Sequence, residues 1–136
     1  MALIIDCSVA LAWSVSSQAT SLTQRAQIAA QANEVVVPYV FPTEIGNALI
    51  VLERRRKLTS AEVDLAIDGL DKLELEVDRE IVDEASRVLM PLARTHRLTF
   101  YDAAYLELAL RTGHPVATRD AALAAAVRKA GATLFE

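Results

Sequence analysis

Four acidic residues stand where their carboxylates could form an oxygen-rich metal site. Asp6 follows an apolar run at the start of the chain, and Asp120 follows another near its end. Glu44 and Asp102 each fall at the start of a predicted helix. Carboxylate ligation without His or Cys favours Mg²⁺ or Mn²⁺ over zinc. Such an ion can lower the pKa of a bound water into the nucleophilic range, which is the chemistry of phosphodiester hydrolysis.

Each acid also has a simpler, purely structural interpretation. A carboxylate at a helix N-cap or first turn meets free backbone N–H groups and the helix dipole, typically for about 0.5 to 1 kcal/mol. Thr99 to Asp102 even matches the capping-box pattern. Whether the acids meet in space decides between the two interpretations.

The strands expected to position these acids are short. Residues 2–5 and 34–37 are apolar without alternation, which is typical of strands covered on both faces in a parallel sheet. Residues 73–77 alternate apolar and acidic side chains, which predicts a half-exposed strand near a sheet edge. Short strands are also predicted at 116–118 and 133–135.

Helices are predicted between these strands. Residues 8–33 are alanine-rich and helix-compatible, with a break near Ser16 and Ser17. The remaining helix signals are Pro42 at a first turn, a capping box from Thr59 to Glu62, Asp78 as an N-cap, Thr99 as a helix start and Asp120 as the last N-cap. The order of elements predicts a single domain over residues 1–136, with a three-layer α/β fold and a mostly parallel central sheet of about five strands.

This topology predicts that the four acids share one edge of the sheet. Parallel strands all end at the same edge, so Asp6, Asp120 and the connection to Glu44 emerge there. The helix that begins near Asp102 must feed a parallel strand at the opposite edge, so its N-terminal end points back to the first edge. Carboxylates gathered in this way stay ionised only if a cation lies among them. We therefore expect a divalent metal ion.

Composition sets limits on the partners. The 136 residues are 53% hydrophobic and 24% charged, which excludes disordered and linker-dominated chains. A protein that binds nucleic acid through its overall charge is positively charged, whereas the net charge here is −4. Binding of a phosphate-containing partner would therefore need a metal ion or local basic residues. A lone Cys7, no basic leader and no long uncharged apolar run predict a soluble cytoplasmic protein without membrane contact.

The segments that hold the acids resemble those of a known family. Taken together and in this order, they make the chain similar to a PIN-domain ribonuclease of the VapC toxin type. The resemblance implies an Mg²⁺- or Mn²⁺-dependent endoribonuclease, the toxin half of a toxin–antitoxin pair, usually homodimeric and silenced by a cognate antitoxin. It rests on residues 3–8, 42–47, 98–105 and 117–123, which read Leu-Ile-Ile-Asp-Cys-Ser, Pro-Thr-Glu-Ile-Gly-Asn, Leu-Thr-Phe-Tyr-Asp-Ala-Ala-Tyr and Ala-Thr-Arg-Asp-Ala-Ala-Leu.

The resemblance assigns roles to individual residues. Asp6, Glu44, Asp102 and Asp120 match the family's acidic quartet. We expect Asp6 and Asp102 to hold the principal metal ion with Glu44 close by, while Asp120 completes the cluster or binds a second, weaker ion.

Three polar residues match supporting positions of the family. Ser8 and Thr118 match small hydroxyl residues beside the acids, although each could instead serve its own helix or strand end. Asn47 lies one helical turn after Glu44 and so on the same helix face, which favours a role in the site. The alternative is that Asn47 is an ordinary amide on the surface.

Other interpretations remain open. The serious alternative is a non-catalytic module whose acidic rim binds a basic partner. The basic run Arg54-Arg55-Arg56-Lys57 could meet RNA, meet the antitoxin or simply complement a helix dipole. Trp13 is interpreted as a core or dimer anchor, and we expect no direct DNA binding by this chain alone.

Overall fold

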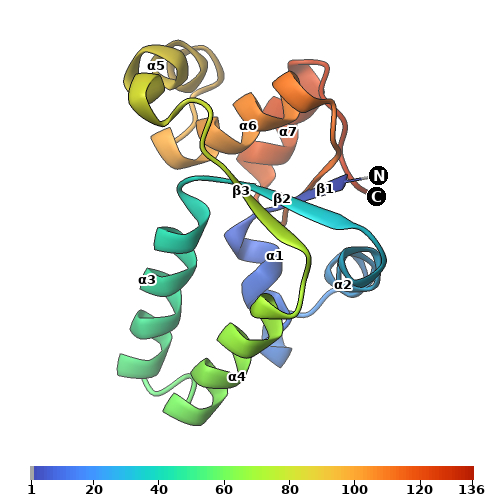
Figure 1. The fold of residues 1–136 in the computed structure, drawn as a ribbon, viewed down its shortest axis with the longest axis vertical. Helices are drawn as coiled ribbons and strands as arrows, with labels where there is room; N and C mark the ends of the chain where they lie inside the picture. The colour runs from blue at the N-terminus through green and yellow to red at the C-terminus, as the bar shows by residue number, and fades with distance from the viewer. Residues whose placement is uncertain (1) are drawn as a thin grey trace.

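A four-stranded parallel sheet forms the centre of the computed structural model, which describes residues 2–136 (Figure 1). The strands lie in the order β3-β2-β1-β4, and every neighbouring pair is parallel. The predicted fold class, an α/β fold with a parallel sheet between helices, is confirmed. The strands are β1 (Ala2–Ile5), β2 (Glu34–Pro38), β3 (Leu75–Asp78) and β4 (Val116–Ala117).

Helices cover both faces of this sheet. In Figure 1, α1, α3 and α4 lie on one side, and α5, α6 and α7 lie on the other. Within residues 2–136, no helix combines the length and the apolarity needed to cross a bilayer. The helices are α1 (Cys7–Ala12), α2 (Ser21–Ala32), α3 (Phe41–Arg54), α4 (Ser60–Asp71), α5 (Ala85–His96), α6 (Phe100–Thr112) and α7 (Ala121–Lys129), with 3₁₀ turns η1 (Ser16–Gln18) and η2 (Val82–Glu84).

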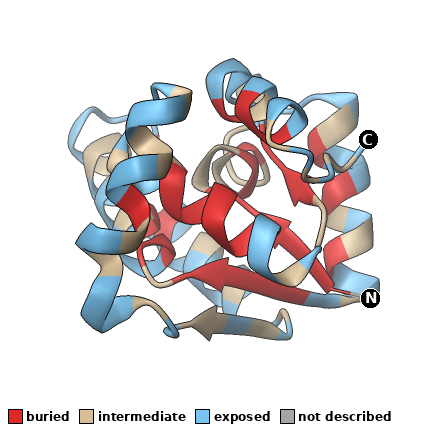
Figure 2. Cartoon of the chain, turned by 90° about the horizontal axis from the view of Figure 1, so that it is seen from above, coloured by how far each residue is buried: buried red, intermediate tan, exposed pale blue. Residues whose placement is uncertain are grey.

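The inner strands supply the centre of the core. All four residues of β1 are buried, and β2 is buried after Glu34 (Figure 2). In β3 the exposed Glu76 alternates with partly buried neighbours, as expected for a strand at the edge of the sheet. The predicted edge strand is therefore confirmed, because β3 pairs with β2 alone among residues 2–136.

Local signals fix several helix ends. The capping box of α4 is complete, since the Thr59 hydroxyl accepts the Glu62 N–H at 3.1 Å and Glu62 accepts the Thr59 N–H at 3.0 Å. Gly113 ends α6 at a φ of 76°, in the left-handed region that glycine adopts without steric cost. The break predicted near Ser16 is also found, as a 3₁₀ turn between α1 and α2.

The predicted strand at 133–135 is the point where the sheet differs from the expectation of about five strands. Within the described residues, only Leu134 pairs there, in an isolated parallel bridge to Val116. The neighbouring β4 is itself only two residues long, so it offers too little edge for a further strand to form.

Asp78 does not cap a helix, so that prediction was wrong. It ends β3, its Oδ1 accepts the Glu80 N–H at 3.3 Å, and α5 begins later, at Ala85. Its carboxylate is instead bound by the guanidinium of Arg111 at 2.7 Å. A long-range ion pair thus replaces the local cap at this position.

Arg111 ties α6 to the end of β3. Besides Asp78, it binds Glu107 of its own helix at 2.7 Å and Glu80 at 2.8 Å. Because α6 also carries Asp102, this contact helps to fix the helix that brings one of the four acids to the sheet.

Candidate functional site

The four acids lie where the sheet topology predicts. Asp6 directly follows β1, and Asp120 follows β4, the strand beside it. Glu44 lies in the first turn of α3, which follows β2, and Asp102 lies in the first turn of α6. Since β2, β1 and β4 are neighbours in the parallel sheet, their carboxyl ends lie side by side at one edge. We call these four residues the acidic rim.

Asp6 is the most enclosed member of the rim, with 4% of its surface exposed. Its Oδ1 accepts the Ser8 hydroxyl at 2.6 Å and the Val9 N–H at 3.0 Å, and its Oδ2 accepts the Thr118 hydroxyl. Burial raises the pKa of this carboxyl, the hydrogen bonds lower it, and the charge of Asp120 raises it further. Asp6 therefore both caps α1 and carries a charge that burial makes costly.

Ser8 and Thr118 connect Asp6 to the segment that carries Asp120. The Thr118 hydroxyl accepts the Asp120 N–H at 2.9 Å, and the Ser8 hydroxyl accepts the Arg119 N–H at 3.0 Å. Each hydroxyl thus donates to Asp6 and accepts a backbone N–H of the segment that holds Asp120. Asp6, and not Ser8, caps α1.

Glu44 is half-buried and held by a residue that the sequence analysis missed. The Tyr105 hydroxyl of α6 donates to Glu44 Oε1 at 2.8 Å, across 61 positions of the chain. Burial and the charge of Glu44 raise the pKa of Tyr105 far above its usual value, so the phenol stays protonated. A signal was present, because Tyr105 lies three residues after Asp102 and so on the same face of its helix.

The rim carboxylates act on one another electrostatically. Burial first, and then the charges of Asp120 and Asp6, raise the pKa of Asp102 to about 6. The pKa of Glu44 is raised by burial first, and then by Asp102 and Asp6, against the lowering effect of the Tyr105 hydrogen bond. The charges of the rim side chains thus act on one another, while Asp6 and Asp120 also cap α1 and α7.

Among residues 2–136, no cation forms an ion pair with this cluster. Across residues 2–136, the ion pairs join Arg111 to Asp78, Glu80 and Glu107, and Arg128 to Glu136. None of them includes a rim acid. The cluster keeps its negative charge available for a ligand from outside the chain.

The chemistry of the rim fits a hard divalent cation, but its side chains do not enclose one as they stand. Among residues 2–136, no three Asp, Glu, His or Cys side chains are arranged to hold a metal ion. The Asp6 oxygens face the Ser8 and Thr118 hydroxyls, and Asp120 Oδ1 accepts the Leu123 N–H at 2.8 Å as the cap of α7. A shared ion thus requires the carboxylates to shift toward it.

Asn47 and Cys7 contribute less than the residues around them. Asn47 is exposed, and its side chain makes no hydrogen bond within the described residues, so the structure does not join it to the rim. Cys7 is half-buried, and burial, together with the charges of Glu44 and Asp6, raises the pKa of its thiol to about 12. It therefore stays a protonated, unreactive thiol at neutral pH.

A second missed contact holds the segment before Asp120. The Arg119 guanidinium donates to the Gln18 side-chain carbonyl of η1 at 3.1 Å. This bond spans 101 positions and had no sequence signal.

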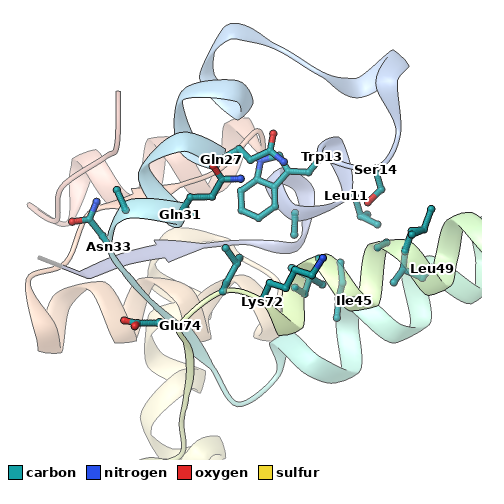
Figure 3. Close-up of a pocket in the computed structure, with 18 of the residues that line it drawn as sticks. Leu11, Trp13, Ser14, Gln27, Gln31, Asn33, Ile45, Leu49, Lys72 and Glu74 are labelled. Carbon is teal, nitrogen blue, oxygen red and sulfur yellow. The ribbon is translucent and has the colours of Figure 1, made fainter.

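A large pocket of about 960 Å³ lies apart from the acidic rim. It opens among α1, α2, α3 and α4, with Trp13 and Gln31 on one side and Ile45 and Lys72 on the other (Figure 3). The Trp13 indole N–H donates to the Thr23 carbonyl at 2.9 Å, which joins the end of α1 to α2. Trp13 itself is half-buried and packs against the edge of the core. No rim acid lines this pocket, so it is not the candidate metal site.

Comparisons with known proteins identify the family and the fold. The sequence model of the PIN domain matches residues 3–129. The fold is similar to the crystal structure of PAE2754 from Pyrobaculum aerophilum, with a TM-score of 0.69 and 21% identity over 93% of this chain and 79% of that one. No curated protein matches the sequence. The chain belongs to the PIN domain family, whose members are typically nucleases that bind divalent metal ions.

Proposed function

We propose that this chain is an endoribonuclease that hydrolyses RNA phosphodiester bonds with a water activated by Mg²⁺ or Mn²⁺. Asp6, Glu44, Asp102 and Asp120 are the proposed metal ligands and catalytic residues. Residues 1–136 are proposed to form one PIN domain.

The observation that carries the proposal is the chemical difference between two sets of acids. Asp78 and Glu107 are bound by the guanidinium of Arg111, which places a positive charge directly beside them. Asp6 and Glu44 are bound by hydroxyl groups, which orient a carboxylate but leave its charge in place. An uncompensated, partly buried cluster of carboxylates is costly unless a cation joins it.

Each residue would have a distinct part in this mechanism. When bound, the divalent ion supplies Lewis acidity and a water of lowered pKa. Asp6 and Asp102 would hold the ion with Glu44 beside them, and Asp120 would complete the site. Ser8 and Thr118 would orient Asp6 through their hydroxyl groups. Because protons and metal compete for the same carboxylates, the raised pKa of Asp102 makes binding weaker below about pH 6.

We further propose that the protein is the cytoplasmic toxin of a toxin–antitoxin pair, homodimeric and silenced by a cognate antitoxin. The support is the resemblance of the segments around the acids to VapC-type sequences. Expression of the chain without a partner gene should arrest growth, and Asp102→Asn should relieve the arrest. Equal toxicity of that variant would mean that the harm does not come from the rim.

One observation favours a second candidate, a non-catalytic module. Within the part of the chain that the structure describes, the rim acids are not arranged to enclose an ion as they stand, and no cation pairs with them. Lysine or arginine side chains of a partner protein could satisfy the same charge without any turnover.

RNA cleavage separates the two candidates. The purified protein is incubated with a labelled single-stranded RNA in Mg²⁺, in Mn²⁺ and in excess EDTA. We expect cleavage only with metal, and a loss of about 100-fold or more in Asp6→Asn, since even indirect support of a metal site is commonly worth about 10- to 100-fold. Asp64→Asn, an exposed acid of α4, is the matched control and should cleave as the wild type does.

Cleavage by Asp6→Asn in excess EDTA at the rate that the wild type reaches with metal would exclude the metal mechanism. Absence of any cleavage by the wild type, together with binding of a basic partner, would favour the non-catalytic module.

A further inference from the structure

We infer that Tyr105 is a positioning residue for this nuclease, and that its hydroxyl holds the Glu44 carboxylate in the orientation needed for metal binding. The inference rests on the proposed function and extends it to a residue outside the acidic quartet.

The geometry of Tyr105 separates its ring from its hydroxyl group. The residue is 1% exposed and is among the largest fully buried side chains, so the ring belongs to the core. Only the hydroxyl reaches the rim, where it donates to Glu44 Oε1 at 2.8 Å. Rigid packing of the ring therefore fixes the position of the donor.

Glu44 depends on this one donor. Asp6 accepts three hydrogen bonds, from Ser8, Val9 and Thr118, whereas the Glu44 carboxylate accepts only that of Tyr105 within residues 2–136. Its second oxygen, Oε2, has no protein partner among those residues. Loss of the phenol oxygen would thus free the Glu44 side chain to rotate, while loss of one donor at Asp6 would leave two.

The nature of the donor suits a ligand for a cation. A phenol has no charge, so it fixes the carboxylate and leaves the full negative charge for the ion. An arginine at the same place would set a positive charge against Glu44, as Arg111 does beside Glu107, and would compete with the ion. The helix α6 thus supplies both the acid Asp102 and, one turn later, the donor for a second acid.

The test is a double-mutant cycle read by Mn²⁺ binding in isothermal titration calorimetry. Tyr105→Phe keeps the ring and removes the hydroxyl, and Glu44→Gln removes the ligand charge. We expect Tyr105→Phe to weaken Mn²⁺ binding by about 10-fold or more in the wild type, and to have no further effect in the Glu44→Gln background. Tyr101→Phe is the matched control, because Tyr101 lies on the same helix, is 54% exposed and makes no side-chain hydrogen bond within the described residues.

A second measurement and a second variant complete the test. In RNA cleavage, Tyr105→Phe should lower kcat and leave KM for RNA unchanged, because the phenol is buried away from substrate. Should Tyr105→Phe fail to fold, Glu44→Asp gives the same test from the other side, since the shorter acid keeps its charge but cannot reach the phenol. Glu44→Asp should also weaken Mn²⁺ binding by about 10-fold.

An unchanged Mn²⁺ affinity in Tyr105→Phe, or an equal loss in the Glu44→Gln background, would overturn the inference. Failure of the proposed function is seen separately, as a wild-type protein that cleaves no RNA with any metal, whatever the cycle shows.

Discussion

Asp6 and Asp78 each stand at the carboxyl end of a strand, yet their surroundings have opposite effects. Burial raises the pKa of Asp6, and the hydrogen bonds from two hydroxyls only partly offset that rise. The Arg111 side chain binds Asp78, and its pKa is lowered. Residue type and position alone do not distinguish these two acids. The group that binds each carboxylate, a hydroxyl or a guanidinium, does. A carboxylate held by neutral donors is ready for a cation, whereas one held by a guanidinium is already satisfied.

Thr118 provides a prediction at this scale. Thr118→Val removes the donor to Asp6 Oδ2 and the acceptor of the Asp120 N–H, with almost no change in volume. We expect about 10-fold slower RNA cleavage and a loss of about 1 to 2 kcal/mol in the free energy of unfolding, because a backbone N–H loses its partner. Urea denaturation and single-turnover cleavage measure the two effects.

The control is Thr133→Val, at an exposed position outside the rim. Equal cleavage rates for Thr118→Val and Thr133→Val would contradict a supporting role for the Thr118 hydroxyl.

The sequence was informative about residues wherever the signal was local. Asp6, Glu44, Asp102 and Asp120 could be placed from their positions after strands and at helix starts, and Ser8 and Thr118 from the segments around them. The bonds from Tyr105 to Glu44 and from Arg119 to Gln18 could not, because they span 61 and 101 positions. Such contacts depend on how helices are rotated in the folded chain.

At the scale of elements, α6 is the helix that organises the rim. Its first turn carries Asp102, its second carries Tyr105, and its last turn is bound to the end of β3 through Arg111. A change at the far end of this helix therefore affects the elements that hold the site.

Arg111→Met tests this connection. Glu107 has only 10% of its side chain exposed, so removal of the guanidinium leaves a nearly buried carboxylate without a cation. We expect the free energy of unfolding to fall by about 3 kcal/mol in urea denaturation, as when one partner of a buried pair is removed.

Arg128→Met breaks a pair in which the side chains are 66% and 76% exposed, so it should cost less than about 0.5 kcal/mol. Similar losses in the two variants would show that Arg111 is no more than a surface contact.

Two errors in predicting the elements have a common cause. Asp78 has the side chain of a good N-cap, and residues 133–135 have the composition of a strand. The first is engaged by Arg111 from 33 positions away, and the second finds a partner strand of only two residues. In both cases a contact with a distant part of the chain, and not the local propensity, determined the structure.

For the whole molecule, the acidic rim makes stability depend on pH. Asp102 has a folded pKa of about 6 against a usual value of 3.8, so the folded chain holds a proton that the unfolded chain has released between these values. Stability from this group is present at low pH and is lost as the pH rises through that range. Asp6 and Glu44, whose pKa values are also raised, act in the same direction.

We therefore expect the free energy of unfolding of the metal-free wild type to fall relative to that of Asp102→Asn between about pH 4 and pH 6, whereas the lowered pKa of Asp78 acts in the opposite direction in both proteins. Urea denaturation in EDTA across this range measures it, with Asp64→Asn as the control that should follow the wild type. An identical pH dependence in Asp102→Asn and the wild type would contradict a raised pKa at Asp102.

The central claim, that the rim carboxylates hold a divalent ion, is tested most directly by a crystal structure with Mn²⁺, located by its anomalous scattering. The account predicts an anomalous peak at the carboxyl edge of the sheet, with carboxylate oxygens of Asp6 and Asp102 among its ligands and Glu44 or Asp120 beside them. A peak at other residues, or none at the rim with Mn²⁺ in large excess, would contradict it.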